Sequence, residues 1–461
     1  MNEEIRIRGA GFRGMRRALA LAVASWALAA AAADSPKLNL TLADCVGLAL
    51  ENNLDLRIEK IVRTVADQEM AAAKGGYDPA LKLSAKRTHE ETAGESAGTA
   101  AGALEVAGSD TDNDAYATSV GGATGLGGLT YEVGAKLGAA DGTRNGNPFD
   151  TSTGSAGVTL TQPLLKGFKT DATRYQVAIA RQQSAEAAAQ LEAKMQDVLS
   201  QVETAWYALL QAHESIVVQD EAVRLATQLY EDNRRKVQIG TLALLDEKQA
   251  ESQAAAARAD LSSAKRAYAE AQNQLKTLLF ADLRQFRNVE LAPIGELASA
   301  PTAVDAAASG ERALATRPDL REARLALARQ GISVKYQKNQ TLPALDLVGG
   351  YGVAASDEDS SADVAERLQS ADEPYWTAGV ELTFPLGNRA AKARHAQSLA
   401  NEEKMKLALR QLEEQALVEV DDAASAVATG YERVQATREA RDYAAQALAA
   451  EERKLDSGQS T

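Results

Sequence analysis

The sequence predicts an α+β membrane protein made of two structural repeats, in which β-strands alternate with long helices. Three observations support this fold class. An amino-terminal export signal is followed by no apolar segment long enough to form a membrane-spanning helix. Four short blocks of sequence recur in the same order in both halves of the chain. Apolar residues follow the helical period over long stretches and the strand period over shorter ones.

Residues 1–33 of the 461 have the three parts of a secretory signal peptide. Five arginines make the first part basic, an apolar core runs from Ala18 to Ala29, and Ala31 and Ala33 are the small residues expected before a cleavage site. Removing the five arginines and two glutamates of this segment leaves 45 of 50 basic and 62 of 64 acidic residues, so the net charge changes from −14 to −17. A chain this acidic is not expected to bind nucleic acid or an anionic lipid surface through its charge.

Cys45 is the only cysteine, which excludes a fold held together by intrachain disulfides. The segment from Leu42 to Cys45 slightly resembles a lipoprotein acylation site, but Asp44 is unusual there and the apolar core ends well upstream. We therefore interpret Cys45 as a buried small apolar residue.

An internal duplication organises the rest of the chain. Four blocks match in order: residues 49–57 with 313–321, 79–83 with 343–347, 157–164 with 379–386, and 236–240 with 454–458. The matches predict a first repeat over residues 34–280, a linker over 281–304 and a second repeat over 305–461. Compared with the first repeat, the second would end before its final helix, with about 35 to 40 residues absent.

The first repeat opens with a predicted helix over residues 41–75, and its later part predicts a long helical hairpin over 168–280. Within residues 188–230 apolar side chains recur at alternating spacings of three and four, which is typical of a coiled-coil seam. At about 1.5 Å per residue, a helix over 168–239 would be roughly 110 Å long. The helices over 41–75 and 241–280 have nearly the same summed length, so we expect them end to end along it.

Strand-like alternation predicts β-strands within residues 79–163, and again around residues 376–384 in the second repeat. One face would contact lipid and the other an aqueous lumen, although a half-buried soluble sheet gives the same alternation. The expected lipid-facing residues are Trp376, Val380, Leu382 and Phe384. Tyr375 and Trp376 are candidates for an interfacial aromatic belt, with ordinary sheet packing as the alternative. Four prolines mark the expected junctions between barrel and helices, because these positions can spare an amide proton: Pro79, Pro163, Pro343 and Pro385.

Three polar segments between the strands are expected to be loops, namely residues 91–114, 141–153 and 355–372. Residues 115–138 look like an extra hairpin inserted into the first repeat. The four remaining principal strands cannot close a barrel, and open sheet edges are not viable in lipid. Three chains would supply twelve strands, so a membrane role predicts a homotrimer.

Catalytic, cofactor and metal sites are not expected, and we do not interpret the chain as an enzyme. The three histidines, His89, His213 and His395, lie in separate segments. Residues 94–98 match the nucleophile-elbow pattern of hydrolases, but without the flanking strand and helix that would orient the serine, so we interpret them as a loop. Asp110, Asp112 and Asp114 have the spacing that opens a calcium-binding loop, but the glycine and glutamate required later are missing, which favours a solvated acidic loop.

Three motifs in their order along the chain resemble the TolC family of outer-membrane efflux proteins, the outer membrane factors of tripartite export systems. Residues 42–53 resemble the opening helix of that family, residues 161–168 its barrel-to-helix junction, and residues 237–246 its periplasmic hairpin tip. The resemblance implies a trimeric, twelve-stranded outer-membrane β-barrel continuous with a long periplasmic α-helical barrel. It also implies a channel-tunnel that works with a periplasmic adaptor (membrane fusion) protein and an inner-membrane transporter in a Gram-negative type envelope, serving tripartite efflux or type I secretion.

By the same resemblance, the hairpin tip would dock on the adaptor and the pore would narrow nearby. The tip residues are Val237, Gly240, Thr241, Leu242 and, in the second repeat, Gly458. Asp246 lies six residues after Gly240, at the position of an acidic residue of the constriction. Two simpler interpretations stay open: Gly240 only turns the chain, and Asp246 forms a salt bridge between helices or on the outer face. A trimeric coiled-coil stalk protein of the cell envelope is the alternative function, and a soluble periplasmic enzyme is a weaker third.

Overall fold

The structure is a computed structural model that describes residues 37–99, 102–106, 108–144, 147–295, 297, 300, 304–358 and 361–456. The predicted signal peptide and Gly458 lie outside these residues. The described chain divides into two compact units. One contains the residues up to Leu54 together with Val198–Ala298, and the other contains Asp55–Asp197 and the residues from Ser299 onward. The first of these units therefore combines parts of the first predicted repeat with the linker, and the second combines parts of both repeats.

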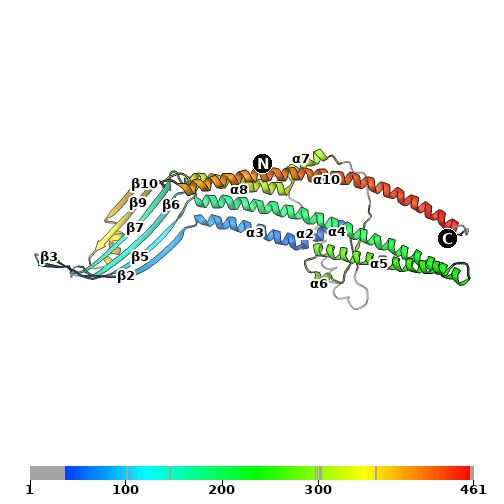
Figure 1. Cartoon of the computed structure of the whole chain (residues 1–461). Helices are drawn as coiled ribbons and strands as arrows, with labels where there is room; N and C mark the ends of the chain where they lie inside the picture. Colours follow the sequence, from blue (N-terminus) through cyan, green and yellow to red (C-terminus); the bar gives the residue numbers. More distant parts are fainter. Residues whose placement is uncertain are drawn as a thin grey trace, which may run out of the picture. The chain divides into compact units, whose positions relative to one another are not determined.

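The second unit contains a six-stranded antiparallel sheet whose order is β10-β9-β7-β6-β5-β2 (Figure 1). Its strands are β2 (Ala80–Thr92), β5 (Ser109–Ala123), β6 (Thr130–Arg144), β7 (Asn147–Pro163), β9 (Ala344–Asp357) and β10 (Pro374–Thr383). The expectation of four principal strands per chain is therefore wrong. The hairpin expected as an insertion over 115–138 is β5–β6, and it lies within the sheet between β2 and β7. It belongs there because both of its strands find full-length partners, which leaves no backbone edge open inside the sheet.

The three segments expected as loops are mostly regular structure. Between β2 and β5 lies a separate hairpin of β3 (Glu95–Thr99) and β4 (Gly102–Val106). Only two residues separate β6 from β7. In the second repeat, β9 continues to Asp357 and is followed by helix α9 (Ser361–Ser370). The polar composition misled the prediction because charged side chains at the ends of strands reach water while their backbones stay paired.

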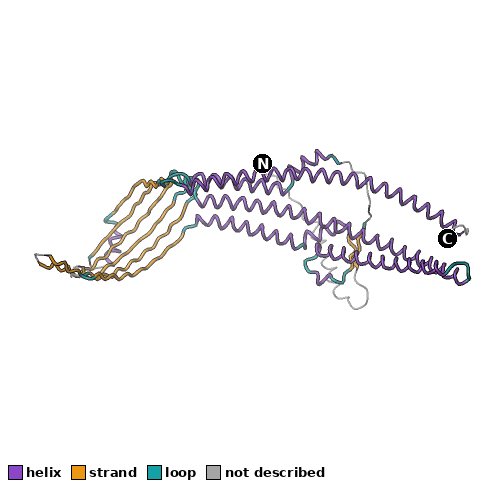
Figure 2. Tube along the Cα trace, viewed as in Figure 1, coloured by secondary structure: helices purple, strands orange, loops and turns teal. Residues whose placement is uncertain are grey.

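Four helices of the same unit form a layer whose order follows that of the strands they continue (Figure 2). They are α3 (Leu54–Lys74), the first part of α4 (Ala172–Gln238), α8 (Pro318–Gln340) and α10 (Arg389–Asp456). Polar contacts join each neighbouring pair of helices. Between α3 and α4, Asp67 accepts a hydrogen bond from Ser184 at 2.6 Å. Ion pairs at 2.8 Å join α8 to its two neighbours, Arg329 with Glu186 of α4 and Arg324 with Glu413 of α10. The rings of Tyr175 and Tyr336 stack at 4.1 Å between α4 and α8.

The other unit packs the last part of α4 against α5 (Leu244–Leu279) and α2 (Leu42–Asn52). Its core includes Val202, Leu209 and Leu275, each at most 1% exposed, and Cys45 is fully buried. The segment expected as a linker also contributes here, since α6 (Leu283–Phe286) and β8 (Glu290–Pro293) lie within it. Strand β8 pairs in parallel with β1 (Lys37–Leu40), a pairing that the sequence did not predict.

The helix expected over residues 41–75 is two helices, because Asn53 ends α2 and α3 starts at the next residue. The amide of Asn53 is buried and donates to the Leu278 carbonyl at 3.1 Å. The second repeat has the same break, where Arg317 separates α7 (Ala306–Thr316) from α8 and Pro318 provides a first residue that needs no amide donor. Among the helices of the described residues, none combines the length and the apolar character needed to cross a bilayer.

Candidate functional site

The pairing register divides the sheet into two chemically different faces. Directly paired residues of antiparallel strands point to the same side. From Trp376, successive partners form one row across all six strands: Trp376, Tyr351, Val158, Val133, Val120 and Leu81. Every member of this row is apolar or aromatic, so the sheet has a continuous apolar face.

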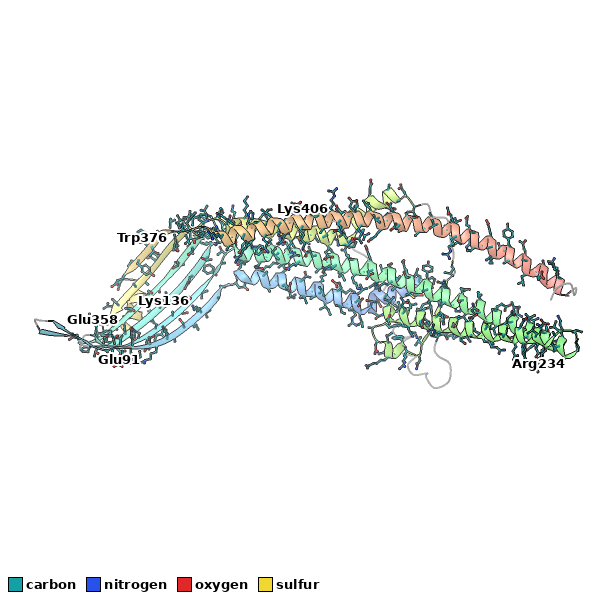
Figure 3. All side chains as sticks on the ribbon, viewed as in Figure 1. Glu91, Lys136, Arg234, Glu358, Trp376 and Lys406 are labelled. Carbon is teal, nitrogen blue, oxygen red and sulfur yellow. The ribbon has the colours of Figure 1, made fainter. Side chains whose placement is uncertain are left out.

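The opposite face is polar and rich in glycine. The row that starts one residue later on β10 contains Thr377, Gly350, Thr159, Glu132, Gly121 and Ala80. By this register Lys136 lies on the polar face and Trp376 on the apolar one; both residues are labelled in Figure 3. The ring of Tyr375 also lies on the polar face, since a Cβ on Gly352 would approach it to 2.8 Å. Tyr375 therefore cannot join Trp376 in a lipid-side aromatic belt, because adjacent strand residues point to opposite faces.

The apolar face is largely uncovered in the single chain. Trp376 is 74% exposed, and the other expected lipid-facing residues, Val380, Leu382 and Phe384, are 63–65% exposed. On β9 the face extends from Leu345 to Val353, which is about 27 Å along the strand, or about 22 Å along the normal of a sheet tilted by roughly 35°. That height is close to the apolar band of about 25 Å on outer-membrane barrels.

Charged groups replace the apolar ones at the outer end of the same face. His89, Asp112, Asp141 and Asp150 are successive partners on four strands. Arg87 contacts Asp112 at 3.1 Å, and His89 contacts the same carboxylate at 2.9 Å. Asp110, Asp112 and Asp114 thus lie in β5 rather than in an acidic loop, and the described residues contain no group of three or more side chains suited to a metal ion. Glu91 and Glu358 lie at this end as well (Figure 3).

Helix α9 covers the apolar face just below these charges. Val364 is fully buried, and its methyl group would lie 2.6 Å from a Cβ placed on Gly154, so only glycine leaves room for this contact. Arg367 pairs with Asp357 at 3.1 Å and ties the helix to the end of β9. The exposed apolar part of this face therefore ends where α9 and the charged groups begin.

The four prolines lie where strands meet helices. Pro79 and Pro343 immediately precede β2 and β9, Pro163 ends β7, and Pro385 follows β10 by two residues. Glycines in the left-handed region follow two of them, at Gly167 (φ 87°) and Gly387 (φ 94°). Asparagine side chains fasten both turns: the Gly167 amide donates to Asn339 at 2.7 Å, and Asn388 donates to the Thr341 carbonyl at 2.8 Å. The two repeats therefore use related turns between strand and long helix.

The hairpin tip begins with a tight helix end at Gly240. Gly240 has φ 75°, its amide donates to the Val237 carbonyl at 3.0 Å, and the Thr241 amide donates to the Lys236 carbonyl at 2.9 Å. This pair of bonds is the Schellman arrangement, in which glycine avoids the steric cost of a left-handed residue. No atom lies within 4 Å of the Cβ that a larger residue would add.

The most exposed apolar side chains of the tip are not the ones that the sequence singled out. Ile239, Leu244 and Leu245 are 74%, 62% and 67% exposed, whereas Val237 and Leu242 are half-buried. The predicted coiled-coil seam of the first helix ends at Tyr230. Large apolar side chains between this residue and the tip therefore have no predicted packing partner. That signal could have identified Ile239, Leu244 and Leu245.

Asp246 lies in the first turn of α5 and is half-buried. Its amide donates to the Ala243 carbonyl at 3.1 Å, and its carbonyl accepts from the Asn233 side chain at 3.5 Å. A carboxylate in the first helical turn is stabilised by the helix dipole. This local role is compatible with a further role of its charge in a pore.

Comparisons with known proteins agree with this geometry. Residues 128–279 and 310–461 match the family described as outer membrane efflux protein. A search of curated proteins finds no match. Three similar solved structures are the CmeC outer membrane channel of Campylobacter jejuni, the outer membrane protein VceC of Vibrio cholerae and a membrane protein from Pseudomonas aeruginosa. Their TM-scores are 0.64, 0.63 and 0.65, at 18%, 17% and 17% identity. The matches cover 91%, 91% and 93% of this chain and 77%, 87% and 85% of those chains, which confirms the fold class.

Proposed function

The chain belongs to the outer membrane efflux protein family, and from this premise we propose that three copies form a continuous export duct. The protein is an outer-membrane channel with a periplasmic extension. In the proposed duct, the apolar face of each sheet contacts lipid and the polar face lines the lumen. The long helices carry the lumen through the periplasm.

The observation that carries this proposal is the register-matched division of the sheet. Six neighbouring strands place apolar residues on one side along a complete row, and the next row places small and polar residues on the other. A coiled-coil stalk would use the helices but would have no use for a sheet with an exposed apolar face. A water-filled barrel in lipid needs both faces.

We further propose that the tip between α4 and α5 docks on a periplasmic adaptor protein, which connects the duct to an inner-membrane transporter. Ile239, Leu244 and Leu245 would supply apolar contact area, and Gly240 would keep the surface free of a protruding side chain. Asp246 would repeat around the axis of a trimer, so its charge would favour cations at the constriction. The repeat boundaries at residues 34–280 and 305–461 remain part of this proposal.

Planar-bilayer recording of the purified full chain tests the proposed function. A duct gives stepwise conductance at protein concentrations where trimers insert, and a stalk gives none. Outer-membrane trimers that never conduct would overturn the proposal.

A further inference from the structure

The two sides of the second unit end in matching open edges. On one side the last elements are β2 and α3, and on the other they are β10 and α10. Among the described strands, β2 and β10 each pair with one other strand only, so each leaves one edge without a partner strand in the described chain. Such edges are not viable in lipid, and the single chain contains no further strand of this sheet among its described residues.

We propose that β10 of one copy pairs with β2 of the next, so that three copies close a barrel of eighteen strands rather than twelve. The inference rests on the proposed channel function and specifies its wall. Each copy contributes six strands because the hairpin β5–β6 is part of the sheet. Barrel diameter grows roughly linearly with strand number, so this lumen is about one and a half times as wide as that of a twelve-stranded barrel.

The strand register within one chain gives this closure a strand tilt that is typical of membrane barrels. Successive partners of Ala80 are Gly121, Glu132, Thr159, Gly350 and Thr377. If the strand ends align at closure, Ala80 of the next copy pairs with Thr383, six residues beyond Thr377. A stagger of six residues over six strands, with a rise of about 3.4 Å and a spacing of about 4.8 Å, gives a tilt of roughly 35°. Membrane barrels have strand tilts of about 35–45°.

The same closure matches chemistry across the seam between copies. It pairs Leu81 with Leu382 and Leu83 with Val380 on the lipid face. On the lumen face it pairs Lys82 with Glu381, so opposite charges lie directly across the new strand pair. A shift by one residue would turn the apolar residues of one edge to the polar face of the other, which excludes that register. A shift by two residues keeps the faces but separates Lys82 from Glu381.

The helices at the two edges complement the strands. On α3, exposed Ile58, Ile61 and Val65 follow the helical spacing and are 51–63% exposed. On α10, Leu407 is 61% exposed and shares one face of the helix with Ala400, Glu403, Lys404, Ala408 and Gln411. A second copy placed by the strand pairing brings its α3 edge to this α10 edge, where small alanines accept larger side chains.

The width of the helix layer also favours six strands. A strand tilted by 35° occupies about 6 Å of circumference, so six strands occupy roughly 35 Å per copy. Four packed helices at 8–10 Å occupy about 32–40 Å. Four strands would occupy only about 23 Å and would narrow the wall at the junction.

Cross-linking in the full-length protein tests the closure. In Lys82→Cys/Glu381→Cys, a thiol reagent spanning about 5 Å should join neighbouring copies and yield a covalent trimer on a denaturing gel. The native Cys45 is fully buried and does not compete. Each single substitution serves as a control and should give no linked species. A ladder that ends at another copy number, or no ladder from assembled protein, overturns the closure.

A second pair of variants tests the strand number itself. Lys82 and Ser119 are direct partners in the six-stranded sheet, so Lys82→Cys/Ser119→Cys should link within one chain. Lys82 and Thr161 lie on strands three spacings apart, about 14 Å sideways, and Thr161 is four residues further along β7 than Gly157, the member of the Lys82 row. Lys82→Cys/Thr161→Cys should therefore not link with the short reagent. A wall of twelve strands would put β2 beside β7 and reverse the second result. Because conductance is recorded on the same samples, a Lys82–Thr161 link in conducting protein overturns the eighteen strands and leaves the channel function standing.

Discussion

At the scale of single residues, the two faces of β10 should respond differently to the same charge. Val380 lies on the exposed apolar face and Thr383 on the polar one. Val380→Arg should impair membrane insertion, because an arginine near the midplane costs roughly 2–4 kcal/mol. Thr383→Arg should insert normally and change the conductance. Outer-membrane yield and single-channel recording measure the two effects, and equal tolerance of both substitutions would contradict a transmembrane β10.

Gly240 tests whether the tip is a docking surface or only a turn. Gly240→Trp should abolish export and leave trimers intact, because nothing in the chain lies where the new side chain starts. Its positive φ adds a strain of about 1 kcal/mol at an exposed turn. Gly240→Asn is the matched control, since asparagine tolerates the same conformation and is small. Export by the Trp variant at the wild-type rate would leave Gly240 with a turning role alone.

Asp246 tests the constriction through its charge. Asp246→Asn keeps the side-chain volume and removes three negative charges from a trimer, so cation selectivity should fall or the resting conductance should rise. Glu247→Gln, one position further along the same helical turn, is the control. Reversal potentials in asymmetric salt give the selectivity, and unchanged values in the Asp246 variant would place that carboxylate outside the pore.

At the scale of elements, the start of α8 is held by an ion pair whose contribution depends on pH. Arg317 contacts Asp319 at 2.8 Å and Glu419 of α10 at 2.7 Å. The hydrogen bonds from Arg317 hold the pKa of the Asp319 carboxyl below its ordinary value. A carboxyl whose pKa is lower in the folded than in the unfolded protein stabilises the folded state at pH values above its unfolded-state pKa. This stabilisation is lost as the pH falls through the folded-state pKa. Because the pair is about one-third exposed, the contribution is below about 1 kcal/mol.

Asp319→Asn should therefore lower the midpoint temperature of unfolding at neutral pH. Between neutral and acid pH this midpoint should fall less in the variant than in the wild type. Thermal unfolding of the detergent-solubilised protein between neutral and strongly acid pH measures both changes. Asp422→Asn, at an exposed position of α10, is the control and should retain the wild-type slope. The same slope in the Asp319 variant would show that other groups determine the acid response.

At the scale of the whole molecule, the protein should fractionate with the outer membrane as a homotrimer. The uncovered apolar face and the two open sheet edges cannot persist in a monomer in water, because both would expose groups that require lipid or a partner. Membrane fractionation followed by mass measurement in detergent tests this expectation. A stable soluble monomer in the periplasm would contradict it.

The sequence by itself determined the features that depend on local period and on single residues. The seam with spacings of three and four within residues 188–230 predicted α4, and alternation predicted the apolar face of β10. The left-handed turn at Gly240 and the prolines at the junctions follow from the backbone limits of these two residue types. The duplication predicted that strands are followed by a long helix in both repeats, with a proline near each junction.

Only the tertiary structure decided which strands are neighbours and what the helix ends contact. The sequence predicted a hairpin over residues 115–138, but its place between β2 and β7 depends on backbone pairing with other strands of the sheet. The pairing of β1 with β8 and the helix break at Asn53 likewise depend on contacts across more than 200 residues, since Asn53 bonds to Leu278. Periodicity specifies which face of an element is apolar, but hydrogen bonding between distant strands decides their order, and that order changes the expected wall from four strands per chain to six.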